Sequence, residues 1–130
     1  VHTDYDACLP DSYVTDQEWR MRQYGNISRI SSLSELRRME STMRDIYGPP
    51  PESVVNLLAV ALVKNRAAAL GADEAALMHR ESAITFRRAK DVPGGLPAAA
   101  EKYGGWLDVG EKVSVRFPTG KSMLRFLTSA

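Results

Sequence analysis

Residues 45–52 read DIYGPPPE, and this stretch divides the first half of the chain into separate helices. Gly48 stands where a helix C-cap places a glycine, because glycine adopts a positive φ without steric cost. The prolines at 49–51 cannot continue that helix, since proline lacks a backbone N–H. Pro51 suits the first turn of a new helix, so the stretch predicts one helix before it and another after it.

Capping sequences predict where the two earlier helices begin. Ser32 and Glu35 form a capping box, and residues 15–18 (TDQE) form another. The apolar side chains of the second helix share one stripe: Leu36, Met39, Met43, Ile46 and Tyr47. Those of the first recur at near-helical spacing: Trp19, Tyr24, Ile27 and Ile30.

The segment after the prolines predicts a central helix from about Glu52 to Leu70, stopping at Gly71. Its apolar residues cover most of its circumference: Val54, Val55, Leu57, Leu58, Val60, Ala61, Leu62 and Val63. A helix this apolar is packed on more than one side.

The remaining segments predict a small sheet. Residues 1–9 alternate in polarity, as a half-buried strand does, and residues 75–78 and 83–86 predict two strands joined by a tight turn at 80–82. A short helix over 98–103, a strand over 113–117 and a final helix follow. The order predicts an α+β fold, in which three N-terminal helices pack on a small, mostly antiparallel sheet with a C-terminal helix. We expect a single domain over residues 1–130.

Composition limits the functional classes. The 130 residues are 44% hydrophobic and 25% charged, as in an ordinary soluble globular protein, and the formal net charge is +1. No overall field therefore attracts nucleic acid or an acidic membrane. Cys8 is the only cysteine, so an internal disulfide is impossible and a reducing cytosol is the expected setting. We find no run that could span a bilayer and no signal segment, and we expect a piece of a larger protein.

The sequence carries only weak signals for a catalytic or metal site. Residues 120–122 (GKS) match the end of a phosphate-binding loop, but Val115 stands where the full motif needs a glycine. We favour a turn in which Thr119 or Ser122 caps the last helix. His2 and His79 have no partner at metal-ligand spacing. Since no nucleophile–base or paired-carboxylate pattern stands out, we expect neither catalysis nor a bound cofactor or metal.

Two residue classes in the first two helices leave alternatives open. One class is basic: Arg20, Arg22, Arg29, Arg37, Arg38 and Arg44. They could bind phosphates, but interleaved acids favour a solvated face with i,i+4 pairs such as Glu40 with Arg44. The other class is aromatic: Tyr13, Trp19, Tyr24 and Tyr47. These could form a stacking platform, but their positions favour packing in or near the core.

The ordered motifs of the first half resemble the C-terminal domain of the bacterial transcription-repair coupling factors. The matching positions run without a gap: Leu9-Pro10, Tyr13, Arg20, Tyr24, Ile27, Glu35-Leu36, Asp45, Tyr47-Gly48, Pro51-Glu52, Leu57-Leu58 and Leu70-Gly71. The second half matches with looser spacing. The resemblance implies that the parent protein is a DNA-translocating ATPase, which removes stalled RNA polymerase and recruits nucleotide excision repair.

The resemblance also implies a non-catalytic, autoinhibitory role for this domain. In the family it packs against a UvrB-like module of the same protein and masks the surface that binds UvrA, until stalled RNA polymerase and DNA are engaged. ATP would be bound only by other domains. UvrA, RNA polymerase and DNA would be indirect partners, without a membrane, and the isolated domain would be a cytoplasmic monomer.

Carried over residue by residue, the family's contact lies on an acidic patch of the second helix. Asp45 keeps its acid, whereas Thr42 stands at the family's Glu position. Arg37 and Arg38 stand at two positions that are often acidic in relatives. We therefore expect the protein-interaction face at Asp45, Thr42, Glu40 and Arg38. The alternative function is a nucleic-acid-binding module that uses the arginines of the first two helices.

Overall fold

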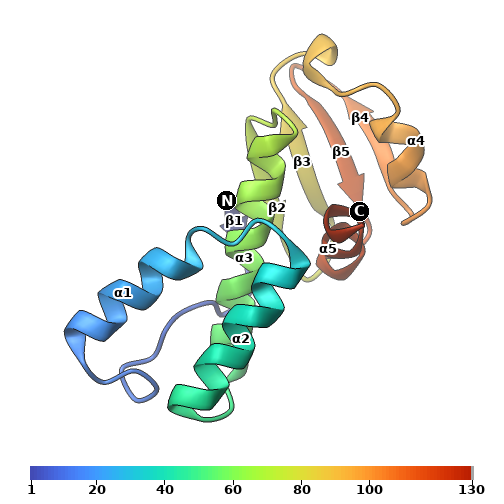
Figure 1. Cartoon of the computed structure of the whole chain (residues 1–130). Helices are drawn as coiled ribbons and strands as arrows, with labels where there is room; N and C mark the ends of the chain where they lie inside the picture. The colour runs from blue at the N-terminus through green and yellow to red at the C-terminus, as the bar shows by residue number, and fades with distance from the viewer. Residues whose placement is uncertain (130) are drawn as a thin grey trace. The chain divides into compact units, whose positions relative to one another are not determined.

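The computed structural model describes residues 1–129 and has an α+β fold, as predicted (Figure 1). The helices are α1 (Gln17–Ile27), α2 (Leu33–Tyr47), α3 (Glu52–Ala69), α4 (Leu96–Glu101) and α5 (Gly120–Thr128), with a 3₁₀ turn, η1, at Ala89–Asp91. The strands are β1 (His2–Thr3), β2 (Glu74–Leu77), β3 (Ser82–Phe86), β4 (Trp106–Val109) and β5 (Val113–Phe117).

Contacts divide the chain into two compact units. The helical unit comprises residues 5–65, with α1, α2 and most of α3. The sheet unit comprises residues 1–4 and the chain from Arg66 onward, with the five strands, α4 and α5.

Side-chain caps set the helix starts in the helical unit. Ser32 caps α2 as predicted, and its hydroxyl accepts a hydrogen bond from the Glu35 N–H at 3.2 Å. The box predicted over residues 15–18 is wrong in detail, because Asp16 rather than Thr15 is the N-cap of α1. The Asp16 carboxylate accepts from the N–H groups of Glu18 and Trp19, at 2.9 and 3.1 Å, so it satisfies two free donors at once.

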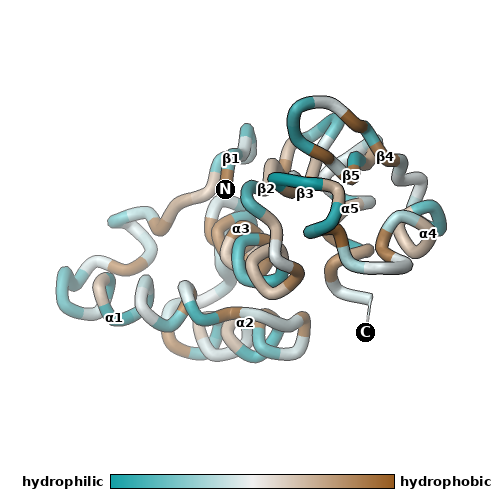
Figure 2. The backbone as a smooth tube through the Cα atoms, turned by 90° about the horizontal axis from the view of Figure 1, so that it is seen from above, coloured by the Kyte–Doolittle hydropathy of each residue, from teal (hydrophilic) through white to brown (hydrophobic). Residues whose placement is uncertain are grey.

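The buried apolar residues of the helical unit come from residues 5–16 (the entry loop), the three helices and the turn between α1 and α2: Leu9, Val14, Ile27, Ile30, Leu36, Met43, Val54, Leu58, Leu62 and Val63. The packing predicted for two aromatics of α1 is wrong. Trp19 and Tyr24 are 46% and 42% exposed, and α1 carries few hydrophobic positions (Figure 2). Both side chains therefore lie largely at the surface of α1.

Ile46, predicted on the apolar stripe of α2, is also 57% exposed. It lies in the last turn of the helix, beyond the buried positions Leu36 and Met43. The stripe prediction thus holds for the first three turns and is wrong at this residue.

The sheet has the strand order β1-β2-β3-β5-β4. Only β1 and β2 run parallel, so the sheet is mostly antiparallel, as expected. The strand predicted over residues 1–9 is wrong beyond Thr3, because the chain from Tyr5 belongs to the helical unit. Strand β4 was not predicted; all four of its residues are exposed, which leaves no buried–exposed alternation to detect.

One face of the sheet carries the core of the sheet unit. Residues Ile84 and Phe86 of β3 and Val115 and Phe117 of β5 are fully buried there. The Phe126 ring of α5 lies 5.2 Å from the Phe117 ring, between centroids, so α5 covers this face. The opposite face carries polar pairs such as Thr85 with Ser114, whose hydroxyl oxygens are 3.1 Å apart.

Candidate interaction site on α2

Three of the four expected contact residues share one side of α2. Arg38, Thr42 and Asp45 are spaced i, i+4 and i+7 and are all exposed. Glu40 lies on a different side of the helix, is partly buried, and pairs with Arg44 at 3.5 Å. That ion pair confirms the predicted i,i+4 pairing. The structure thus brings Arg38, Thr42 and Asp45 together and leaves Glu40 apart.

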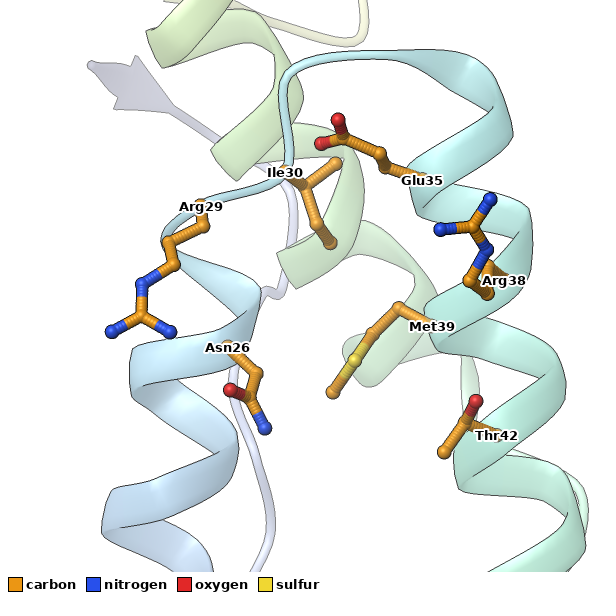
Figure 3. Close-up of a pocket in the computed structure, with 7 residues that line it drawn as sticks. All are labelled: Asn26, Arg29, Ile30, Glu35, Arg38, Met39 and Thr42. Atoms are coloured by element: carbon orange, nitrogen blue, oxygen red, sulfur yellow. The ribbon is translucent and has the colours of Figure 1, made fainter.

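A hollow of about 220 Å³ lies between the end of α1 and this side of α2 (Figure 3). We call it the α1–α2 groove, and it is lined by Asn26, Arg29, Ile30, Glu35, Arg38, Met39 and Thr42. Figure 3 shows Asn26 from α1 and Met39 from α2 pointing into the space between the helices. Arg29 projects on the α1 side and Arg38 on the α2 side.

The lining from α1 and the following turn was not expected from the sequence. The sequence marks Arg29 only as one of six arginines in the first two helices, and it marks Ile30 only as one of several apolar residues at near-helical spacing. No pattern in residues 17–30 reveals that Arg29 and Ile30 line the same hollow as Met39, because the spacing of residues in one helix does not encode which helix packs beside it. The available signal was the concentration of arginines in both helices.

The charged side chains that line the groove differ in whether they already have a bonding partner. The Glu35 carboxylate accepts hydrogen bonds from the Ser31 N–H at 3.0 Å and the Ser31 hydroxyl at 3.3 Å, so it helps to hold the start of α2. Within residues 1–129, Arg29 and Arg38 make no ion pair. Among the described residues, the groove therefore presents two guanidinium groups that form no ion pair and one carboxylate that is hydrogen-bonded to Ser31.

Other arginines of these helices are already used inside the unit. Arg20 pairs with Asp11 at 3.1 Å and donates to the Leu9 carbonyl at 2.7 Å. The Arg22 guanidinium lies 4.8 Å from the Trp19 ring centroid, a cation–π contact on the exposed part of α1. The solvated-face interpretation thus fits Arg44, which pairs with Glu40, but not Arg20, whose side chain is largely buried.

The GKS turn is a helix cap. Thr119 is the N-cap of α5, and its hydroxyl accepts from the Ser122 N–H at 3.1 Å, as predicted.

Elsewhere in the sheet unit, a hydrogen bond from Lys112 Nζ at 2.8 Å lowers the pKa of the Asp73 carboxyl, and the same contact raises the pKa of Lys112.

Residues 1–129 contain no group of three or more His, Cys, Asp or Glu side chains placed to hold a metal ion. No helix in the described chain is both long and apolar enough to cross a membrane.

Comparison with known proteins assigns the family. Residues 3–95 match the family model described as the TRCF domain. This chain belongs to the TRCF domain family. A transcription-repair-coupling factor of Borreliella burgdorferi is 23% identical over 93 residues, which cover 72% of this chain and 8% of that protein. The chain thus spans a small part of its curated relative.

A solved structure also resembles this TRCF domain. The crystal structure of the C-terminal domain of transcription-repair coupling factor has a TM-score of 0.75 and 19% identity. The match covers 96% of this chain and 84% of that one, and it shows a shared fold. The resemblance expected from the sequence motifs is therefore confirmed.

Proposed function

We propose that this TRCF domain is the autoinhibitory interaction domain of a parent transcription-repair coupling factor. In this proposal it covers a UvrB-like module of the same protein and masks the UvrA-binding surface until stalled RNA polymerase and DNA are engaged. The family match over residues 3–95 carries the proposal. The domain catalyses no reaction itself, and ATP is bound and hydrolysed by other domains of a cytoplasmic DNA translocase.

The contact face is Arg38, Thr42 and Asp45 on α2, with Glu40 acting only through Arg44. All three of these side chains are exposed, so they can meet a partner without unfolding the unit. The contact must be modest in strength, because an autoinhibited protein has to open when its partners bind. A population shift needs only a difference in affinity between the closed and open states.

Titration calorimetry of this domain against the UvrB-like module of its parent protein tests the proposal. Asp45→Arg should weaken binding by at least about tenfold, since it places a like charge where an acid meets a basic partner group. Glu111→Arg is the matched control, because it makes the same charge change at an exposed acid of the sheet unit and should leave affinity unchanged. Failure of the wild-type domain to bind the module, both free and joined to it by a flexible linker, would contradict the proposal.

A second candidate function is nucleic-acid binding by the arginines of α1 and α2. The observation that favours it is that Arg29, Arg37 and Arg38 make no ion pair in the described chain. Such binding would show a steep salt dependence, because each phosphate contact releases counterions. No retention on DNA at low salt would exclude it.

A further inference from the structure

The size of the α1–α2 groove indicates what can fill it. Pockets for small ligands and cofactors measure about 300–1,000 Å³, and this hollow is smaller, at about 220 Å³. It suits one or two side chains of a docking protein. Grooves between neighbouring helices commonly receive the apolar face of a third helix.

The floor of the groove suits an apolar anchor. Ile30 is buried and Met39 is partly exposed, so the thioether lies within reach of an incoming side chain. Methionine has three flexible bonds and a polarizable sulfur, so it adapts its shape to a partner. Figure 3 shows both side chains directed into the hollow.

The charges at the rim select the polar groups of the partner. Arg29 lies on the α1 side of the hollow, with its guanidinium directed away from α2, and Arg38 lies on the α2 side. Each guanidinium can form a bidentate pair with a carboxylate. Within residues 1–129 the Glu35 carboxylate forms no ion pair with either arginine and instead accepts hydrogen bonds from Ser31.

We propose that the α1–α2 groove binds an amphipathic helix of the partner protein, with one apolar side chain between Ile30 and Met39 and carboxylates paired with Arg29 and Arg38. The inference rests on the proposed function in taking the UvrB-like module as the source of that helix. It assigns acidic chemistry to the partner at the start of α2, whereas Asp45 faces a basic group two turns further along.

A protein fits the groove better than a nucleic acid does. Asp45 lies on the same side of α2 and would oppose a phosphate backbone that ran along the helix. The floor formed by Ile30 and Met39 offers nothing to a phosphate backbone, and neither residue is an aromatic platform for a base.

Nuclear magnetic resonance titration of the ¹⁵N-labelled chain tests the inference. The probe is a helical peptide of about 18 residues with a leucine stripe flanked by glutamates; a second peptide has lysines in their place. The glutamate peptide should shift the Asn26 and Met39 amide signals, and the lysine peptide should not. A short DNA duplex serves as the third probe.

A double charge reversal adds a quantitative test. Arg29→Glu with Arg38→Glu should lower the affinity for the glutamate peptide by at least about tenfold. Arg37→Glu with Lys64→Glu makes the same charge change at two exposed residues outside the groove and should leave affinity unchanged. Arg29→Gln with Arg38→Gln, checked by thermal melting, should also weaken binding if the reversed variant does not fold.

Three results would overturn the inference: no groove shifts with the glutamate peptide at millimolar concentration, equal binding of both peptides, or groove shifts with DNA alone. The calorimetric experiment separates this inference from the proposed function. If the UvrB-like module binds the wild-type and Arg29→Glu/Arg38→Glu domains equally, the inference fails and the proposed function stands. If the glutamate peptide fills the groove but the module does not bind, the proposed function fails and the groove serves another partner.

Discussion

At the residue scale, Tyr13 links the entry loop to the end of α2. Its hydroxyl donates a hydrogen bond to the Gly48 carbonyl at 2.7 Å, and its ring lies 5.6 Å from that of Tyr47. Burial raises the pKa of Tyr13, so the hydroxyl stays protonated and keeps its donor. The entry loop thus secures the end of α2, although 35 residues separate the bonded groups.

Gly48 itself requires glycine. Its φ of 88° and ψ of −179° lie in a region that is essentially reserved for glycine, and an added Cβ would meet no atom within 4 Å. Gly48→Ala should therefore destabilise the domain through backbone strain alone, by about 1–3 kcal/mol. Denaturant titration measures the change in the free energy of unfolding.

Gly25→Ala is the matched control for this prediction. Gly25 lies inside α1 and also has open space around it, so alanine there should be neutral or stabilising by up to about 1 kcal/mol. Equal effects at the two positions would contradict the argument from backbone conformation.

At the element scale, α3 is the central helix of the helical unit. Its hydrophobic residues are spread around the helix, and Val54, Leu58, Leu62 and Val63 are fully buried. Polar residues of α3 also hold the neighbouring loops. The Asn65 amide donates to the carbonyls of Ser28 and Ile30, at 2.8 and 2.7 Å, and thereby fixes the turn that carries Ile30 into the groove.

Leu58→Asp should unfold the helical unit. A carboxylate at this fully buried position has no partner in the apolar core, and the cost is of order 5 kcal/mol, comparable to the whole stability of a small domain. Circular dichroism melting measures the effect. Met21→Asp, at a position 70% exposed on α1, is the control and should melt close to wild type. A cooperative Leu58→Asp melt near the wild-type temperature would refute the central placement of α3.

At the scale of the whole molecule, charge is balanced and locally paired. The formal net charge is +1, and acids and bases are interleaved between residues 35 and 112. In the sheet unit Arg116 bridges Glu81 and Asp108, at 2.7 and 2.9 Å. Such pairing cancels the long-range field that would draw a polyanion.

The wild-type domain should therefore show no retention on immobilised DNA at about 0.15 M salt, where non-specific binders that rely on phosphate contacts are already weak. Fluorescence anisotropy with labelled duplex DNA at several salt concentrations measures this. Arg37→Glu should not change the result. Tight binding with a steep salt slope, lost in Arg37→Glu, would favour the nucleic-acid-binding alternative.

The sequence by itself determined the features that are encoded locally. The Ser32 cap, the Gly48 stop and the prolines at 49–51 fix the limits of α2 and α3, because each acts on the backbone within one turn. The tertiary structure alone decided which surfaces meet. It placed Arg29 opposite Arg38, left Trp19 exposed, and added β4 through its ladder with β5. These outcomes depend on contacts between distant segments, and the residues of one segment carry no periodic signal for them.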